Sequence, residues 1–398
     1  MEHFDVVIVG SGPGGYMSAK LLLERGKSVA LVEKSVFGGV CLNAGCIPKE
    51  GLYKLALEKS KPRWKVAVQM VQGKVIEIRD TSLKTLLSKG LTYVEGDGEL
   101  IDERVIKVGN RRLTASHIIL ACGSKQREPG ISPEDVLRGW AIPKNNVCIV
   151  GGGAAGCELA FILSSFGFKV YLVRKDTVLK GYRNIPEEFA LKLEDALERC
   201  GVKLVENTKN VDADLVIRAT GRIPNFCQER FPFVAVDERG FVRTDSFLET
   251  DTKGIFAVGD IVPPMGAGYA FEKARVAVRS ILYDKERVFD PRKVPVIISS
   301  AYQIGFVGDA KDAKISVIKP LGTNPKAYVT GNDGIISVGF DDSGRLVYCC
   351  LIGREVGEIL NLCATLLGKN LEEHLSFAHP SYGEIINEIL SIKQEVCR

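Results

Sequence analysis

Residues 4–15 read FDVVIVGSGPGG and decide the fold of the first part of the chain. The apolar run Phe4–Val9 predicts a buried strand, the glycines after it predict a tight turn, and a helical pattern then continues to Arg25. A second apolar strand is expected from Ser28 to Val32. This order of strand, turn, helix and strand is the unit that holds the pyrophosphate of a dinucleotide at a helix N-terminus.

Glu33 closes that second strand. A carboxylate at this position accepts hydrogen bonds from ribose hydroxyls. The first unit therefore predicts a nucleotide with a free 2′-hydroxyl.

A second copy of the pattern begins with the apolar strand Val147–Val150. Residues 151–156 read GGGAAG, a helix is expected through Phe166, and the strand Lys169–Val173 follows. The chain is thus expected to bind two dinucleotides.

The second copy differs from the first at one informative position. Where the first copy has Glu33, the second has Arg174, followed by Lys175. Two cations can pair with a 2′-phosphate, so NADP(H) is predicted in preference to NAD(H). The alternative is that both cations are solvated surface charges and the ribose is held otherwise.

From about Val294 the pattern changes to alternating strands, followed by two helices over 355–367 and 382–393. The expected strands are Val294–Ser299, Lys314–Ile318, Ile335–Gly339 and Leu346–Leu351. No phosphate-binding turn occurs here, so an α+β domain is predicted whose apolar sheet face must be covered.

Composition narrows the function further. A length of 398 residues predicts two or three domains, and a net charge of +4 is too small and too evenly spread for nucleic-acid binding. No run of 18 apolar residues exists, so no membrane span is expected, and the strand-like start of the chain predicts a cytoplasmic protein. Most of the eleven cysteines should then be reduced thiols. The sequence has four histidines and no cysteines or histidines at the spacing of zinc ligands, so no metal site is expected.

Residues 38–49 read GGVCLNAGCIPK and contain the most informative pair of cysteines, Cys41 and Cys46. On a regular helix they would be ~7.5 Å apart along the axis, beyond disulfide reach, so a turn must bring them together. Gly45 permits the turn, and Pro48 places Cys46 at or near a helix N-terminus, where a thiolate is stabilised. A redox-active pair is predicted, and the alternative is two unpaired buried thiols.

Together with these motifs, the segments Thr220–Arg222, Gly259–Asp260 and 379–384 (HPSYGE) resemble the class I pyridine nucleotide-disulfide oxidoreductases, most closely the dihydrolipoamide dehydrogenases. The resemblance covers nearly the whole chain. It implies an α/β fold with two Rossmann-like domains and a C-terminal α+β dimerisation domain. The implied boundaries are 1–142 with 255–285 for FAD, 143–254 for NAD(P), and 286–398 for the homodimer.

The resemblance also implies roles for four residues. Cys41 would form the mixed disulfide with substrate and Cys46 would contact the flavin. His379 of a second copy would be the general base, and Glu384 would orient its imidazole. Electrons would pass from a dihydrolipoyl dithiol, free or on a lipoyl-bearing carrier protein, through the cysteine pair and FAD to the nicotinamide.

Two other functions remain open from the sequence. In one, the enzyme would be a reductase of another small disulfide, and electrons would flow in the opposite direction, from NADPH to the disulfide. Arg174 makes the sequence resemble the NADPH-dependent glutathione reductase branch in this respect. A non-catalytic, FAD-holding protein of a multienzyme complex is the alternative of another class.

The remaining predicted site residues are those assigned to the two nucleotides. They are Gly10, Gly12, Gly14, Gly15, Glu33, Lys34, Gly39, Lys49, Gly98, Ala121, Gly123, Gly151, Gly153, Gly156, Glu158, Arg174, Lys175, Gly221, Gly259, Asp260 and Ala267.

Besides Arg174, which stands where an NAD-using lipoamide enzyme is expected to have an acidic residue, the sequence departs from the family at three positions. The family's lysine falls at position 50, where this chain has Glu50, with Lys49 one residue earlier. Cys122 replaces the usual threonine, and Gly268 stands where a histidine is common.

Overall fold

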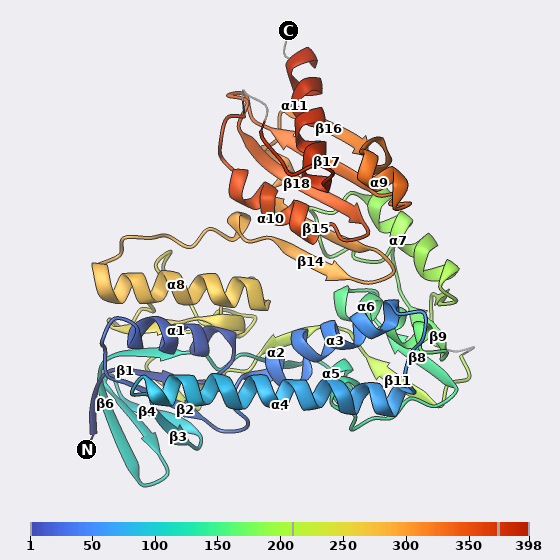
Figure 1. Cartoon of the computed structure of the whole chain (residues 1–398). Helices are drawn as coiled ribbons and strands as arrows, with labels where there is room; N and C mark the ends of the chain where they lie inside the picture. Colours follow the sequence, from blue (N-terminus) through green and yellow to red (C-terminus); the bar gives the residue numbers. More distant parts are fainter. Residues whose placement is uncertain (1, 209–210, 372–374, 397–398) are drawn as a thin grey trace. The chain divides into compact units, whose positions relative to one another are not determined.

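The computed structural model describes residues 2–208, 211–371 and 375–396 (Figure 1). The chain divides into two compact units. The first unit contains Met1–Leu55, Lys59–Ile142 and Gly221–Pro291; the second contains Ala56–Glu58, Pro143–Thr220 and Arg292–Arg398.

The first unit is built on a mixed sheet with strand order β3-β2-β1-β6-β5-β4, to which β13 adds beside β6. The strands are β1 (Glu2–Val9), β2 (Val29–Glu33), β3 (Thr92–Glu95), β4 (Gly98–Asp102), β5 (Val105–Val108), β6 (Arg111–Leu120) and β13 (Ile255–Ala257). Strands β3, β2, β1, β6 and β13 run parallel, and their residues are largely buried on both faces.

The helices of this unit are α1 (Pro13–Leu23), α2 (Gly39–Ala44), α3 (Cys46–Leu57), α4 (Trp64–Ser88), α5 (Pro133–Arg138) and α8 (Ala267–Tyr283). Helices α1 and α8 lie side by side (Figure 1). A short antiparallel pair, β7 (Ser124–Gln126) with β12 (Arg222–Pro224), lies outside the main sheet.

The second unit holds two sheets. A parallel sheet of order β10-β9-β8-β11 contains β8 (Asn146–Val150), β9 (Lys169–Val173), β10 (Lys203–Val205) and β11 (Leu215–Arg218), with helices α6 (Ala154–Ser165) and α7 (Glu187–Arg199). This is the second dinucleotide-binding pattern that the sequence predicts.

The other sheet of the second unit is antiparallel, with order β14-β15-β18-β17-β16. Its strands are β14 (Val296–Ser299), β15 (Gln303–Gly308), β16 (Ile315–Pro320), β17 (Ile335–Phe340) and β18 (Leu346–Gly353), and the short helix α9 (Pro325–Val329) lies between β16 and β17 in the chain. Helices α10 (Gly357–Leu366) and α11 (Ile385–Val396) bury apolar side chains such as Leu360 and Ile389 against it. The α/β fold with two Rossmann-like patterns and a C-terminal α+β part is confirmed.

Three segments pack differently from the expected domain boundaries. Residues 221–254, expected with the second nucleotide-binding domain, and 286–291, expected with the dimerisation domain, belong to the first unit, while Ala56–Glu58 belong to the second. For 221–254 the physical reason is backbone pairing, because β12 pairs with β7 and Glu249 bridges to Phe256 of β13.

Over the described ranges 2–208, 211–371 and 375–396, none of the helices has both the length and the apolar character needed to cross a bilayer.

Candidate active site

The first glycine turn joins β1 to α1 through close backbone approaches. Gly10 has φ of 102°, and a Cβ there would lie 2.3 Å from the carbonyl oxygen of Ala121. A Cβ on Gly15 would lie 1.8 Å from the carbonyl oxygen of Gly10. These contacts leave no room for side chains, so strand and helix meet as a phosphate-binding turn requires.

The N-terminus of α1 faces open space. Its N-cap, Gly12, has no capping side chain, and a Cβ built on Gly12 would meet nothing within 4 Å. The first-turn amides of a helix have no intrahelical partner, and they lie at the positive end of the helix dipole. This end of α1 suits an anion such as a pyrophosphate.

Glu33 is fixed beside the turn by three hydrogen bonds. Its Oε2 accepts from the Ser11 amide at 2.9 Å and from the Ser11 hydroxyl at 2.6 Å, and its Oε1 accepts from the Ser35 amide at 2.8 Å. The Ser11 hydroxyl in turn accepts from the Gly38 amide at 2.9 Å. Sequence reasoning missed Ser11, although a hydroxyl residue inside a buried glycine turn was the available signal.

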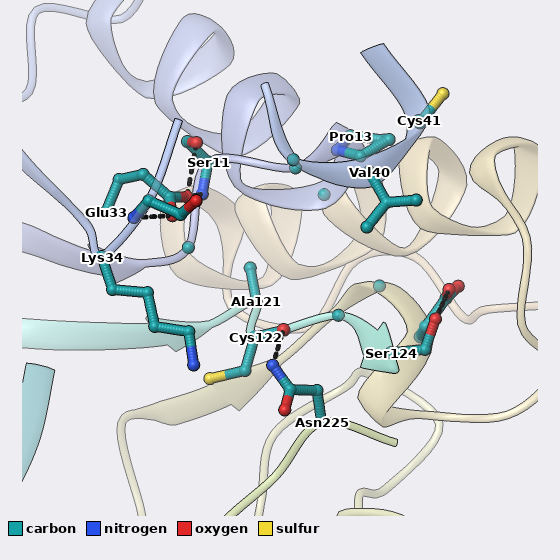
Figure 2. Close-up of a pocket in the computed structure, with 18 of the residues that line it drawn as sticks. Ser11, Pro13, Glu33, Lys34, Val40, Cys41, Ala121, Cys122, Ser124 and Asn225 are labelled. Carbon is teal, nitrogen blue, oxygen red and sulfur yellow. Dashed lines mark hydrogen bonds between the residues drawn. The ribbon is translucent and has the colours of Figure 1, made fainter. Parts of the chain in front are cut away.

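A cavity of about 620 Å³ runs through the first unit from Glu33 to the cysteine pair. In Figure 2, Glu33 and Lys34 lie at one end of the lining residues and Cys41 at the other. The lining contains these predicted positions: Gly10, Gly12, Gly14, Glu33, Lys34, Gly39, Cys41, Cys46, Gly98, Ala121, Gly123, Gly259, Asp260 and Ala267. The structure therefore brings most of the predicted cofactor residues of this unit together with both cysteines.

Three predicted positions of this unit are not in the lining. Gly15 packs behind the turn, and Gly221, with φ of 106°, makes a turn whose carbonyl accepts from the Arg127 amide. Lys49 is paired with Glu50, its Nζ being 3.2 Å from Oε2 of that residue. The lining instead contains four other cations, which are Lys34, Arg138, Arg222 and Arg230.

The two cysteines lie on separate helices. Helix α2 ends at Ala44, the backbone of Gly45 is non-helical with φ of −123° and ψ of −115°, and α3 begins at Cys46. Cys46 is thus the first residue of a helix, as predicted. Cys46 is exposed and Cys41 is partly buried, and both are thiols in this structure.

The two thiols interact. The hydrogen bond to Cys46 is the largest cause that raises the pKa of Cys41, followed by burial, and the Asp260 carboxylate adds to the effect. The backbone break at Gly45 therefore brings together two sulfurs that a continuous helix would hold apart.

Asp260 projects from the turn that follows β13. Its Oδ2 accepts from the Ser124 hydroxyl at 2.6 Å and its Oδ1 from the Gly266 amide at 2.8 Å. Arg222 supports this contact, since its Nε donates to the Ser124 hydroxyl at 2.8 Å and it also pairs with Glu134. The sequence motif at 220–222 therefore acts here through Arg222, which sequence reasoning did not single out.

The second glycine turn repeats the packing of the first. Gly151 has φ of 122°, and a Cβ there would lie 2.4 Å from the carbonyl oxygen of Ala219. A Cβ on Gly156 would lie 1.9 Å from the carbonyl oxygen of Gly151. Helix α6 begins after an N-cap, Gly153, that has no capping side chain.

Arg174 lies beside this turn, since a Cβ built on Gly152 would be 3.1 Å from the Arg174 Cβ. Its Nε is 2.9 Å from Oε1 of Glu194, a carboxylate that also accepts from the Val178 amide at 2.8 Å. Lys175 is exposed. Arg174 is therefore engaged with a buried carboxylate, which the sequence did not indicate.

Glu158, the remaining predicted residue of this part, lies on α6. Its Oε1 accepts from the Ser299 amide at 3.0 Å.

His379 and Glu384 form a hydrogen-bonded pair in the second unit. Nδ1 of His379 is 2.9 Å from Oε1 of Glu384, whose Oε2 accepts from the Ser381 amide at 2.8 Å. The Ser381 amide and then His379 lower the pKa of Glu384. The imidazole is 73% exposed, and with Nδ1–H held by the carboxylate its Nε2 can accept a proton.

In the part of the chain that the structure describes, no group of three histidine, cysteine, aspartate or glutamate side chains is arranged to hold a metal ion.

Comparison with known proteins agrees with this arrangement. The sequence is 28% identical to the dihydrolipoyl dehydrogenase of Haloferax volcanii over 96% of this chain and 95% of that protein, and 29% identical to that of Pseudomonas aeruginosa over 96% of both. Among solved structures, the HOCl-induced flavoprotein disulfide reductase RclA of Escherichia coli superposes with a TM-score of 0.86 at 24% identity, covering 98% of this chain and 100% of that one. LpdA of Mycobacterium tuberculosis gives 0.87 at 18% identity, covering 98% and 99%.

The sequence also matches the pyridine nucleotide-disulphide oxidoreductase family over residues 4–280, well over half of its length. The two glycine turns, the paired cysteines and the cavity of the first unit that the cysteines help to line are the parts that such an enzyme needs. The chain therefore belongs to the pyridine nucleotide-disulphide oxidoreductase family and is an FAD-dependent enzyme.

Proposed function

We propose that this enzyme exchanges electrons between a dihydrolipoyl-type dithiol and a nicotinamide nucleotide through the Cys41–Cys46 pair and FAD. The observation that carries the proposal is the contact between the two thiols in the same cavity as the glycine turn and Glu33. The full-length similarity to dihydrolipoyl dehydrogenases supports the substrate class.

The residues that line the cavity of the first unit have the chemistry that FAD binding requires. Glu33 offers a fixed carboxylate to ribose hydroxyls, and the uncapped N-terminus of α1 offers amides to the pyrophosphate. Asp260 offers a second carboxylate in the lining, and Cys41 lies at the opposite end of the lining from Glu33 (Figure 2). Bound there, FAD supplies a two-electron acceptor and donor next to the dithiol.

The exchange itself needs only sulfur chemistry. With the pair oxidised, a substrate thiolate attacks the Cys41 sulfur, the Cys41–Cys46 bond breaks, and Cys46 leaves as a thiolate. The second substrate thiolate then attacks the substrate sulfur of the mixed disulfide and releases Cys41. The substrate is oxidised to its disulfide, two electrons enter the cysteine pair, and each attacking thiol has given up a proton.

We assign the acceptance of these protons to His379. Its Nε2 is available while Glu384 holds Nδ1, which is the arrangement of an oriented general base. We further propose a homodimer in which the imidazole of one copy serves the dithiol of the other, as the family resemblance implies.

The preference for NAD(H) or NADP(H) depends on Arg174. Its position beside the second glycine turn suits a 2′-phosphate, which is why we propose NADP(H). Glu194 already neutralises this cation, so a phosphate has to compete with a buried carboxylate. A second candidate function, NADPH-driven reduction of another small disulfide, rests on this same arginine.

The test is steady-state kinetics of the purified enzyme with four reactant pairs. The pairs are dihydrolipoamide with NADP⁺, dihydrolipoamide with NAD⁺, glutathione disulfide with NADPH and glutathione disulfide with NADH. We expect dihydrolipoamide with NADP⁺ to give the highest kcat/KM of the four. Higher activity with glutathione disulfide would favour the second candidate. A strong preference for NAD⁺ would refute the assignment of Arg174 to a 2′-phosphate.

Glu194→Gln refines that test. Removing the carboxylate charge frees the Arg174 guanidinium, so KM for NADP⁺ should fall while KM for NAD⁺ changes little. Equal effects on both nucleotides would show that Arg174 does not contact the 2′-position.

A further inference from the structure

A fully buried lysine lies beneath the loop that carries Asp260. Lys273, on α8, has no solvent exposure. Its Nζ donates to the carbonyl oxygens of Gly259 at 3.1 Å and Pro264 at 2.6 Å, and also to that of Val262. An ammonium group has three protons, so these three carbonyls use all of its donors.

Such a burial is costly and needs a reason. Lysine is among the residues least often fully buried, because its charge loses hydration. Desolvation lowers the pKa of Lys273 to about 7, while the Asp260 carboxylate acts in the opposite direction. Lys273 does not line the cavity, so it does not act on a ligand directly.

The loop it holds does line the cavity. Gly259, Asp260 and Gly266 face the space assigned to FAD, and Asp260 hydrogen-bonds across to Ser124 and along the loop to Gly266. Without Lys273, the carbonyls of Gly259, Val262 and Pro264 would lack this donor, and the loop would lose the three hydrogen bonds that join it to α8.

We propose that Lys273 is a positioning residue for the cofactor: its ammonium group fixes the loop 259–266 so that the Asp260 carboxylate is held in place toward FAD. This inference rests on the proposed role of the cavity as the FAD site. Lys273 also places a positive charge behind Asp260, which offsets the negative potential of that carboxylate in the cavity.

Lys273→Met tests the proposal, because methionine retains the apolar length of the side chain and removes the ammonium. Lys393→Met is the matched control. Lys393 is also buried and its Nζ donates to the Gly344 carbonyl oxygen at 2.7 Å, to Asn370 Oδ1 at 3.4 Å and to the Leu371 carbonyl oxygen at 3.4 Å, but it belongs to the second unit.

The measurements are FAD binding to the apoprotein by flavin fluorescence, and the midpoint potential and visible circular dichroism of the bound flavin. For Lys273→Met we expect Kd for FAD to rise about tenfold or more, the potential to become more negative, and the dichroism of the flavin to change. Lys393→Met should leave all three unchanged.

Urea unfolding of the apoproteins shows whether both variants are folded. If Lys273→Met does not fold, Lys273→Gln, which keeps two amide donors, should fold with an intermediate FAD affinity. A folded Lys273 variant with the Kd, potential and dichroism of the wild type would overturn the inference. Failure of the wild-type protein to bind FAD would instead refute the proposed function.

Discussion

At the scale of single residues, the pKa of Cys41 depends on its neighbour Cys46. Its thiol is partly buried, lies near the Asp260 carboxylate and is hydrogen-bonded to Cys46, and each of these raises its pKa. The reduced pair should therefore hold Cys41 as a neutral thiol at neutral pH.

The order of these causes gives a pH prediction. Because the bond to Cys46 is the largest of them, Cys46→Ala should lower the pKa of Cys41, and its alkylation by iodoacetamide should begin at lower pH than in the reduced wild type. The measurement is the alkylated fraction of the Cys41 peptide by mass spectrometry across a pH series.

Cys46→Ser is the matched control, since its hydroxyl can still accept from Cys41 and the profile should move less. An unchanged profile in Cys46→Ala would show that burial and Asp260, and not the second thiol, determine the protonation of Cys41.

The imidazole pair is the other residue-scale feature. His379→Gln should lower kcat for dithiol oxidation by about 10²–10⁴-fold, since general base catalysis is typically worth that much, and Glu384→Gln should cost less because the imidazole remains. Stopped-flow reduction of the enzyme by the dithiol isolates the step. FAD content is the control, and a loss of flavin along with activity would point to misfolding instead.

The Glu384 carboxylate also sets an acid limit for this pair. Its pKa is lowered by the Ser381 amide and by His379, so the ionised form is favoured in the folded chain and its contribution is complete above the ordinary glutamate pKa of 4.5. That contribution is lost as the pH falls through the lowered pKa. In the neutral range Glu384 should therefore remain charged and hold Nδ1.

At the scale of elements, two glycines of the first turn are expected to have different roles, Gly15 in the stability of the fold and Gly12 in cofactor binding. Gly15→Ala would place a methyl group against the Gly10 carbonyl oxygen, and we expect it to destabilise the first unit by about 1–3 kcal/mol in urea unfolding. Gly12→Ala has free space around it and should leave the apoprotein as stable as the wild type while weakening FAD binding.

The comparison of the two variants decides between the roles. Equal stability of the Gly15→Ala and wild-type apoproteins would contradict the close approach of α1 to the turn. Wild-type FAD affinity in Gly12→Ala would contradict the binding of the pyrophosphate at this end of α1.

The elements that the sequence predicted are those with a strong local signal. Both glycine-turn units, the start of a helix at Cys46 and the two C-terminal helices follow from apolar periodicity and from glycine and proline at fixed positions. Strand β15 was missed because two of its six residues are glycine, which is depleted in strands. The pairing of β12 with β7 is a contact distant in sequence that no local pattern encodes.

The candidate site divides in the same way. Cys41, Cys46 and Glu33 were found because their motifs are local. The ion pair of Arg174 with Glu194 and the burial of Lys273 were not, because each depends on a partner brought in by tertiary packing. Lys49 was expected at the cavity from its sequence position, but it lies outside the lining beside Glu50.

At the scale of the whole molecule, the proposed homodimer makes a quantitative prediction. Cys41→Ser should be inactive with dithiol substrates, and His379→Gln should retain about 1% of the activity or less. If the base comes from the second copy, hybrid dimers of the two variants contain one complete site, and random mixing should restore about a quarter of the wild-type activity.

The measurement is activity after the two variants are unfolded together, refolded with FAD and purified as dimers. Each variant refolded alone is the control. Dimers that contain both variants and show no activity would contradict a site shared between copies.

The two glycine turns of this chain have the same close backbone packing. In each, the first glycine abuts the carbonyl of the alanine that directly follows the neighbouring parallel strand, β6 or β11, and the last glycine abuts the carbonyl of the first. Any difference between the ligands of the two turns should then reside in side chains beside them, such as Glu33 and Arg174. Nucleotide choice in this scaffold should accordingly be open to redesign by a few side-chain substitutions, with the main chain left as it is.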